Sequence, residues 1–547
     1  MNLRFVLTLH SHLPWVLHHG RWPHGSDWLC EAALDSYLPL VAVLDRLEAE
    51  GVPSPITLGI TPILAAQFAH PSFRDELDAY FQQRLLTLEK APASLAASGD
   101  LHLLPLIEFW RAHIEALRAT WHRIEYDLIG AFRRHAQAGR IELISSAATH
   151  GFLPLLARDE SIRLQLLTGR AEHVRHFGDV PAGCWVPECA YRPRGPWQPL
   201  PSAPKQAMRR GIEDHLQHAG FQWFFVDGHL VDAGEATDIY GGSTRPRTTS
   251  KRSPYRAYQV GRAVRGKKVS VLVRDPEATA QVWSRHGGYP GDVRYLEFHK
   301  LYPGGLKLWS VTDHSGDLGA KQPYQPATAE DAALTHAGHF RDMLDSIAGH
   351  ASKKDRAVVA PFDTELFGHW WFEGMDFLFD LYQIFVGDAV IAPSTAGAAL
   401  AASPPTTALR MSAGSWGADG DFSMWLNDET AWTWERLWPL EERFWNVVPA
   451  AMRRIEALPI LEQAARELLL AQSSDWQFII STGAAGDYAT ERFNQHCDAL
   501  ERLLAPLEHP ELDLASTRAF AAALERIDGP FPDLIGAIAA ASDVTAP

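Results

Sequence analysis

The sequence predicts an α/β fold in which a parallel β-sheet, covered by helices, closes into a barrel and is followed by an all-helical domain. Three observations support this prediction. Short apolar runs with the character of fully buried strands alternate with helix-like runs, there are seven of them, and the chain from Asp428 onward is mostly helical in pattern. In a barrel of such units, functional groups gather at the carboxyl ends of the strands. The expected strands are Leu3–Leu9, Pro55–Ile60, Ile141–Ser146, Gly183–Pro187, Trp223–Asp227, Val269–Arg274 and Val358–Phe362.

Two segments between these runs have the pattern of barrel helices. Tyr37 to Glu50 is followed by Gly51, and Ser161 to Phe177 is followed by Gly178. Helical periodicity that ends at a glycine is a common helix stop, because glycine adopts the left-handed conformation at low cost. We therefore expect helices in the first and third gaps between strands.

The second gap is too long for one barrel helix, and we expect residues of about 65–140 to form an inserted helical subdomain. Apolar side chains recur within it at spacings of three and four, which predicts one long amphipathic helix ending near Gly139. These side chains are Ile107, Trp110, Ile114, Leu117, Trp121, Ile124 and Leu128.

A polar segment of about residues 228–268, rich in Gly, Ser, Thr, Pro and Arg, is expected to be a mobile loop over the catalytic domain of residues 1–400. Residues 401–540 are expected to be the C-terminal helical domain, with a tryptophan-rich face toward the substrate. Its expected helices are Glu429–Arg453, Leu458–Ala471, Tyr488–Leu504 and Ser516–Ile527.

Charge and cysteine content restrict the kind of partner. The formal net charge is −16 and no run of Lys and Arg forms a phosphate-binding stripe, so a nucleic-acid partner is not expected. No window of eighteen apolar residues suggests a membrane span. The 4 cysteines have no C-x-x-C spacing, which favours a reduced cytoplasmic location and argues against zinc held by cysteine.

Two of the expected strands deliver a carboxyl group at their carboxyl ends. Val358 to Phe362 leads into Asp363 and Glu365, with His369 and Trp370 close behind, and Gly183 to Pro187 leads into Glu188. A carboxylate at the end of a buried strand is costly unless it is paired or used. One such acid fits a structural role as well as a catalytic one, but two acids among aromatic residues are what glycoside hydrolysis requires.

Polar residues follow other strands at the same edge. His10-Ser11-His12 places two imidazoles on one face of a strand end, which suits a metal pair, sugar hydroxyls or a structural role. No third ligand of suitable spacing is evident, and this favours substrate contact. His150 follows the third strand, and Arg274-Asp275 follows the sixth, where the pair either orients a catalytic carboxyl or is structural.

Aromatic side chains in polar surroundings are candidates for stacking on sugar rings. Trp283, Trp416 and Trp425 have Gly or polar neighbours, and Asp475-Trp476 lies at a break in a helical pattern. In contrast, another group sits at helical spacing and is expected in the core. It comprises Trp432, Trp434, Trp438 and Trp445.

Taken together, these motifs resemble glycoside hydrolase family 57, and within it the 1,4-α-glucan branching enzymes. The resemblance rests on His10 to Pro14, Gly59 to Leu64, Trp185 to Tyr191, Pro361 to Trp371 and Ser473 to Phe478, in order over nearly the whole chain. It implies an α/β fold with an incomplete (β/α)7 barrel, a helical insertion and a C-terminal all-helical domain.

The resemblance also implies a retaining mechanism with Glu188 as nucleophile and Asp363 as general acid/base. An α-1,4 bond is cleaved through a glycosyl-enzyme, and the chain is transferred to a 6-hydroxyl to make an α-1,6 branch. A tyrosine on a mobile loop is expected to help exclude water, with Tyr240 the first candidate by position and Tyr255 or Tyr258 as alternatives.

The expected partner is an α-1,4-glucan such as amylose or a glycogen-like chain, with no cofactor, metal or membrane, and the protein is expected to be a monomer or a weak homo-oligomer. Three other functions are compatible with the residues. They are an α-amylase or 4-α-glucanotransferase on the same scaffold, a non-catalytic glucan-binding protein, and a metal-dependent deacetylase using His10 and His12.

Overall fold

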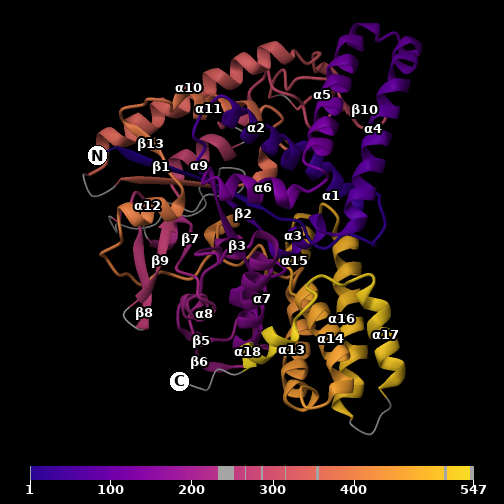
Figure 1. The fold of residues 1–547 in the computed structure, drawn as a ribbon, viewed down its shortest axis with the longest axis vertical. Helices are drawn as coiled ribbons and strands as arrows, with labels where there is room; N and C mark the ends of the chain where they lie inside the picture. Colours follow the sequence, from indigo (N-terminus) through magenta and orange to yellow (C-terminus); the bar gives the residue numbers. More distant parts are fainter. Residues whose placement is uncertain are drawn as a thin grey trace.

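The computed structural model describes residues 2–231, 252–264, 267–284, 287–314, 316–352, 356–509 and 514–542. Within these ranges the centre of the fold is a 9-stranded sheet in the order β12-β1-β2-β3-β4-β7-β9-β8, with β13 beside β1 (Figure 1). The strands are β1 (Leu3–Ser11), β2 (Ile56–Ile60), β3 (Ile141–Ser146), β4 (Gly183–Trp185), β7 (Trp223–Val226), β8 (Tyr258–Val264), β9 (Lys267–Val273), β12 (Ala357–Asp363) and β13 (Ile391–Pro393).

All seven predicted strands are confirmed, and they are parallel. Each neighbouring pair from β12 through β9 is parallel, and β8 alone pairs with β9 in the antiparallel sense among these described strands. At the far side of the sheet, Arg274 forms a parallel bridge with Val359, and the amide of Asp275 donates to the carbonyl of Val359 at 2.8 Å. The carboxyl end of β9 therefore meets β12.

The register of the sheet brings strand ends together. His10 pairs with Asp363 and with Gly59, and Ser146 pairs with Trp185. Because parallel strands all end at one edge, residues that follow β1, β3, β4 and β12 share that edge.

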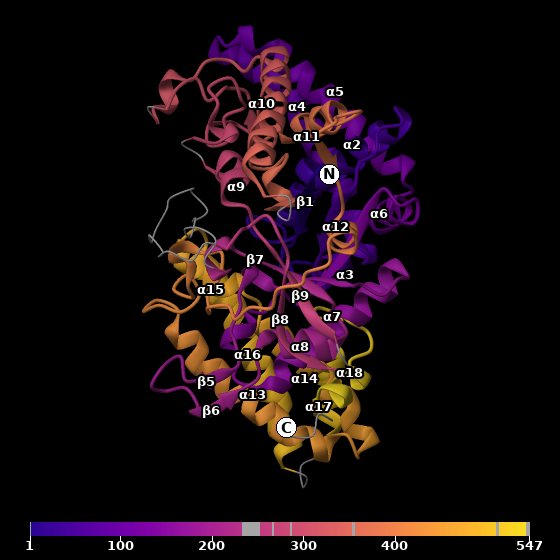
Figure 2. The ribbon, with the colours of Figure 1, turned by 90° about the vertical axis from the view of Figure 1, so that its left-hand side faces the viewer.

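Helices cover the sheet on both sides. As drawn in Figure 1, α2, α10 and α11 lie above the strands and α7 and α8 below them, and Figure 2 shows the same layers from the side. The helices of this part are α1 (Ser26–Ala32), α2 (Leu38–Ala49), α7 (Asp159–Phe177), α8 (Ile212–Ala219), α9 (Pro276–Trp283), α10 (Pro326–His350), α11 (Gly374–Ile384) and α12 (Ala396–Ala402). Two short hairpins complete it, β5 (Gly195–Trp197) with β6 (Gln206–Arg209) and β10 (Leu301–Tyr302) with β11 (Leu306–Lys307).

The insertion between β2 and β3 is helical, but the predicted single helix up to Gly139 is wrong. The chain forms α5 and then α6, because Glu125 and Tyr126 take left-handed backbone conformations, with φ of 55° and 65°, and end the first helix. Asp127 then caps α6 by accepting from the amide of Gly130 at 2.7 Å. The insertion comprises α3 (Pro62–Phe68), α4 (Pro71–Ser98), α5 (Leu104–Arg123) and α6 (Leu128–Gln137), and α4 and α5 project side by side (Figure 1).

The prediction of a mobile loop over 228–268 is wrong for the last part of that segment. Residues from Tyr258 onward form β8, in which Tyr258 and Val260 are buried and pair with Val271 and Val269 of β9. The polar composition of the whole segment concealed this short alternation of buried side chains. Residues 232–251, including Tyr240, lie outside the described residues.

The C-terminal region is helical, as predicted. Trp434, Trp438 and Trp445 are buried, and the indole N–H groups of Trp438 and Trp445 donate to the carbonyl of Leu155 at 2.8 Å and to Ser161 Oγ at 2.9 Å. These bonds fix the region against the segment that enters α7. Its helices are α13 (Ala431–Ala451), α14 (Leu458–Ala471), α15 (Asp475–Thr482), α16 (Gly486–Glu508), α17 (Ala515–Glu525) and α18 (Ile535–Ser542).

Two further features bear on the sequence predictions. Cys30, Cys184, Cys189 and Cys497 are free thiols, each of them buried. Within the described ranges, none of the helices combines the length and the apolar character that a membrane span needs.

Candidate active site

Glu188 lies in a strained turn directly after β4. Pro187–Cys189 forms the single turn η4, and within it Glu188 and Cys189 have positive φ values of 59° and 48°. Such conformations cost roughly 1–3 kcal/mol each for residues with a side chain, and they persist only where surrounding contacts hold them. One of the two strained residues is therefore Glu188, the carboxyl residue that the sequence predicts at the end of this strand.

Two donors from distant parts of the chain hold the Glu188 carboxyl. The indole Nε1–H of Trp416 donates to Oε2 at 2.8 Å, and the Ser474 hydroxyl donates to Oε1 at 3.1 Å. Burial raises the pKa of Glu188 to about 7; the Trp416 hydrogen bond opposes this rise and the charge of Asp363 adds to it.

Asp363 ends β12 beside His10 of β1. Burial raises the pKa of Asp363 to about 8, the Glu365 carboxyl adds to the rise, and the Arg274 guanidinium opposes it. Both carboxyls therefore hold their protons to a higher pH than carboxyls in water do. His10 Nε2 lies 3.0 Å from His150 Nε2, and His150 Nδ1 lies 3.6 Å from Glu188 Oε1, so the segments that carry Asp363 and Glu188 meet through these two rings.

His10, His12 and His150 form a stack beside these carboxyls. The rings of His12 and His150 lie 4.1 Å apart, and the ring of His10 lies 4.6 Å from that of Trp185. Burial and the neighbouring imidazoles hold the pKa values of His10 and His150 well below the usual range, so both rings are neutral. His12 Nε2 lies 2.8 Å from Asp475 Oδ2, which joins the predicted Asp475 to this cluster.

The neutral rings support one consistent direction of hydrogen bonding toward Glu188. His10 Nε2 lies 3.0 Å from His150 Nε2, and His150 Nδ1 lies 2.9 Å from Ser474 Oγ. Because the Ser474 hydroxyl donates to Glu188, His150 Nδ1 donates to Ser474 Oγ, and His150 Nε2 accepts from His10 Nε2. The histidines that the sequence predicted as substrate contacts therefore also orient the Glu188 carboxylate through Ser474.

Arg274 and Asp275 follow β9 but have different surroundings. Arg274 donates from Nη1 to Asp227 Oδ2 at 2.9 Å, and its guanidinium carbon lies 5.3 Å from the centre of the Trp416 ring. Asp275 is fully buried and caps α9 by accepting from the amide of Ala278 at 2.7 Å. Of the two roles that the sequence leaves open for the Arg274-Asp275 pair, the cap on α9 supports the structural one for Asp275.

The exposed sugar-stacking rings predicted from polar sequence neighbours are mostly absent from the surface. Trp425 and Trp476 are buried, the first against the Phe152 ring at 4.5 Å and the second with its indole N–H on the carbonyl of Leu470 at 2.8 Å. Trp416 is also buried, with its N–H rather than its ring face serving the site. Residues distant in sequence cover the first and last of these rings, Phe152 on Trp425 and Trp185 on Trp416, which sequence neighbours do not reveal.

Trp283 and Trp370 remain partly exposed to solvent. Trp283 is half-buried, with its ring 6.4 Å from that of Trp416. Trp370 is 55% exposed, and its ring lies 4.6 Å from that of Phe298 in a tilted arrangement. Both rings stay candidates for contact with a sugar. Of the alternative loop tyrosines, Tyr258 is buried in β8, whereas Tyr255 is half-buried.

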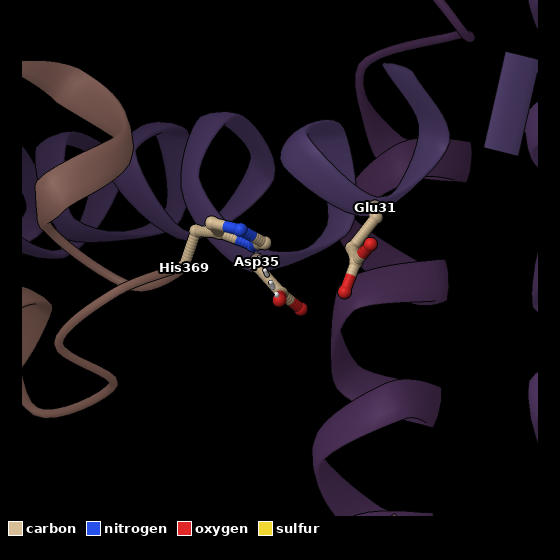
Figure 3. Close-up of side chains that lie close together, drawn as sticks. All are labelled: Glu31, Asp35 and His369. Atoms are coloured by element: carbon tan, nitrogen blue, oxygen red, sulfur yellow. Dashed lines mark hydrogen bonds and ion pairs between the residues drawn. The ribbon is translucent and has the colours of Figure 1, made fainter. Parts of the chain in front are cut away.

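His369 lies in a group of side chains that includes two carboxyls. Figure 3 shows Glu31, Asp35 and His369 close together, and His369 Nδ1 lies 3.2 Å from Asp35 Oδ2. Although burial opposes it, the Lys307 ammonium and His369 hold the pKa of Asp35 at about 2. Lys307 Nζ, 3.5 Å from Asp35, already supplies a positive charge there.

Three groups of acidic and histidine side chains among the described residues are close enough to hold an ion, and none contains His10, His12 or His150. They are Glu31 with Asp35 and His369, Asp45 with Glu48 and His135, and Glu467 with His496 and Asp528. The stacked histidines of the candidate site are thus not among the described groups with metal-binding geometry.

Ser474, Glu365 and Tyr37 belong to the site but were not predicted. Ser474 bonds to Glu188, and Tyr37 donates its hydroxyl proton to Glu365, two residues beyond Asp363. The Ser473-Ser474-Asp475 break in the helical pattern and the acid pair Asp363 and Glu365 were signals for two of them. Tyr37 lies in an ordinary helical pattern and gave no signal.

Comparison with known proteins identifies the family. The profile of glycosyl hydrolase family 57 matches residues 6–396, and the profile described as the C-terminal region of 1,4-alpha-glucan branching enzyme matches residues 439–536. A 1,4-alpha-glucan branching enzyme of Thermococcus kodakarensis is 37% identical over 91% of this chain and 73% of its own.

Two solved structures are similar over the whole chain. The crystal structure of a family 57 branching enzyme from Pyrococcus horikoshii has a TM-score of 0.90 and 35% identity, covering 100% of this chain and 98% of that one. The α-amylase AmyC of Thermotoga maritima has a TM-score of 0.80 and 26% identity, covering 100% of both chains. The matched profile spans the strands that carry Glu188 and Asp363, and the chain belongs to glycosyl hydrolase family 57.

Proposed function

We propose that this chain is a retaining 1,4-α-glucan branching enzyme built on an incomplete (β/α)7 barrel. The observation that carries the proposal is the Glu188 carboxyl, held by Trp416 and Ser474 in the electrostatic field of Asp363. Similarity to a branching enzyme extends over the whole chain, including Trp416 and Ser474, and the matched C-terminal profile includes Ser474. The single bridge between Arg274 and Val359 supports an incompletely closed barrel.

The mechanism follows from the different protonation of the two acids. Glu188, ionised, attacks the anomeric carbon of an α-1,4-linked glucosyl unit, while protonated Asp363 gives its proton to the departing 4-oxygen. The glycosyl-enzyme ester then reacts with a 6-hydroxyl, whose proton returns to Asp363 as the new α-1,6 bond forms. Two inversions at one carbon leave the α configuration unchanged.

We expect a narrow bell-shaped dependence of kcat/KM on pH, with its maximum between about pH 7 and pH 8. Activity falls on the acid side as Glu188 takes up a proton, near its pKa of about 7, and on the alkaline side as Asp363 loses one, near its pKa of about 8. The measurement is the loss of amylose–iodine colour across pH. A flat response between pH 4 and pH 7 would contradict the assignment of the acid limb.

The acid limb should move in the Trp416→Phe variant. Loss of the N–H donor destabilises the ionised Glu188 carboxyl, so its pKa rises and the limb shifts upward by about half to one pH unit. Trp445→Phe is the matched control, because it also removes a buried indole hydrogen bond, but the acceptor of that bond is Ser161 and not Glu188. An equal shift in both variants, or none in Trp416→Phe, would contradict the role of this hydrogen bond.

Branching is separated from hydrolysis by the products. Proton NMR of amylose treated with the enzyme should show an α-1,6 anomeric signal, with little release of reducing ends. The similarity to an α-amylase makes hydrolysis the second candidate, for which reducing ends would appear in proportion to the linkages lost and no α-1,6 signal would form. Branching requires that water be kept out and an acceptor chain held in place.

A further inference from the structure

The segment that carries Asp363 is held by a π-helical turn. Between α1 and α2 the chain forms a five-residue π-helix, η1 (Ala33–Tyr37), and three successive residues of this turn contact the segment after β12. Asp35 bonds to the His369 ring, Ser36 Oγ accepts from the amide of His369 at 3.2 Å, and Tyr37 donates to Glu365. Short π-helical insertions are frequent at functional sites.

The two segments approach so closely that no side chain fits between them. Gly368 has a φ of 99°, and a Cβ there would overlap the carbonyl oxygen of Asp35. The chain from Asp363 to Trp371 is therefore fixed against η1 by backbone contact as well as by side chains.

Glu365 is held from two directions. Its Oε1 accepts from the hydroxyl of Tyr37 on η1 and from the backbone amide of His12, at the end of β1, at 3.2 Å. The preceding Thr364 hydroxyl lies 2.7 Å from that of Ser11. These bonds fix a second carboxyl two residues from the acid/base.

We propose that Glu365 is a positioning residue, whose carboxyl, fixed by Tyr37 and the main chain of His12, keeps the exchangeable proton on Asp363. This inference rests on the acid/base role proposed for Asp363. Glu365 has no role in the two bond-forming steps themselves. Its negative charge disfavours a second charge on Asp363 before cleavage, and favours return of a proton to Asp363 when the acceptor hydroxyl attacks.

The charges around Glu365 support this direction. The titratable groups around the pair are Tyr37 from η1, His10 at the end of β1, His12 just after β1 with its partner Asp475 on α15, Arg274 just after β9, and Glu188 on η4. Glu365 is the largest charge acting to raise the pKa of Asp363, and Arg274, which opposes it, also binds Asp227. Burial raises the pKa of Glu365 to about 7 against the Tyr37 hydrogen bond, so near pH 8, where Asp363 titrates, Glu365 is mostly ionised.

The test compares pH profiles of kcat/KM for loss of α-1,4 linkages in three variants. Glu365→Gln removes the charge with little change of shape, so the pKa of Asp363 falls and the alkaline limb moves down by about one pH unit. Tyr37→Phe should also move the alkaline limb to lower pH, but by less, because Glu365 loses a hydrogen bond to its ionised form and stays protonated to a higher pH. Glu365→Asp keeps the negative charge, so the alkaline limb of its kcat/KM profile should lie close to that of the unmodified enzyme.

Glu373→Gln is the matched control. Glu373 Oε1 accepts from the Tyr324 hydroxyl at 2.7 Å and from the amide of Leu296 at 2.9 Å, and its pKa is raised by burial to about 7, so its surroundings copy those of Glu365. Glu373 is not among the charges that act on Asp363. The alkaline limb should stay in place in this variant.

The outcomes separate this inference from the proposed function. A Glu365→Gln profile lowered equally at every pH, with the limb in place, would assign Glu365 a structural role and overturn the proposal. An alkaline limb that persists in Asp363→Asn would instead overturn the acid/base assignment itself. Because the readout is cleavage, these results do not depend on whether the acceptor is a glucan or water.

Discussion

Replacement of Glu188 by glutamine should lower kcat on amylose by about 10⁴-fold or more, because a neutral amide cannot attack the anomeric carbon. Trp416 and Ser474 would still surround the side chain, so the loss is chemical rather than structural. The measurement is the initial rate of iodine-colour loss at pH 7.5. A residual rate within tenfold of the original would remove Glu188 from the role of nucleophile.

Stability provides the check that the fold survives. A carboxyl whose pKa is raised from 4.5 to about 7 on folding binds its proton more tightly in the folded state, so its contribution to stability falls as pH rises through that interval. Glu188→Gln should therefore have an equal or higher Tm at pH 8. Glu142→Gln is the control for the general effect of replacing a buried carboxyl by an amide. The pKa of Glu142 is also raised by burial, but this residue lies at the opposite end of the sheet.

Asp363→Asn should lower the rate on amylose by about 10²–10⁴-fold, the usual contribution of a positioned acid/base. The loss should be far smaller with α-maltosyl fluoride as donor, since fluoride departs without a proton. Added azide, which needs no general base, should then restore turnover and give α-maltosyl azide. Fluoride release and the anomeric NMR signal of the azide measure the two steps separately.

The stereochemistry of the azide product distinguishes the two carboxyls. With Asp363→Asn the azide attacks the glycosyl-enzyme and the α configuration is kept. With Glu188→Gln it replaces the missing nucleophile, attacks the α-fluoride directly and gives the β product. A β-azide from Asp363→Asn would mean that the two roles are exchanged.

The strands could be predicted because their signal is local. Each buried parallel strand is a short apolar run, so all seven were recognised, together with the carboxyl groups at the ends of β4 and β12. The helix break at Glu125 and Tyr126 was missed because neither residue is a glycine or proline, and their left-handed conformation is decided by packing. Strand β8 was missed because the polar composition of residues 228–268 masked a short alternation of buried side chains.

The site was predicted in part, for the same physical reason. His10 and Asp363 lie at the carboxyl ends of strands, and His150 and Arg274 follow strands, so the rule that parallel strands end at one edge places them together. Contacts across hundreds of residues, such as that of Tyr37 with Glu365, leave no trace in local sequence. The polar neighbours of Trp416 and Trp425 predicted exposure, but both rings are buried, packed against Trp185 and Phe152, which are distant in the sequence.

Both donors to the Glu188 carboxyl, Trp416 and Ser474, come from the chain beyond residue 400, outside the profile match that covers the sheet. The two halves of this protein are therefore not interchangeable modules. A chimera that joins residues 1–400 to the C-terminal region of another family member takes the residues that this relative has in place of Trp416 and Ser474. Where those residues differ, the acidity of the nucleophile should change without any change in either carboxyl.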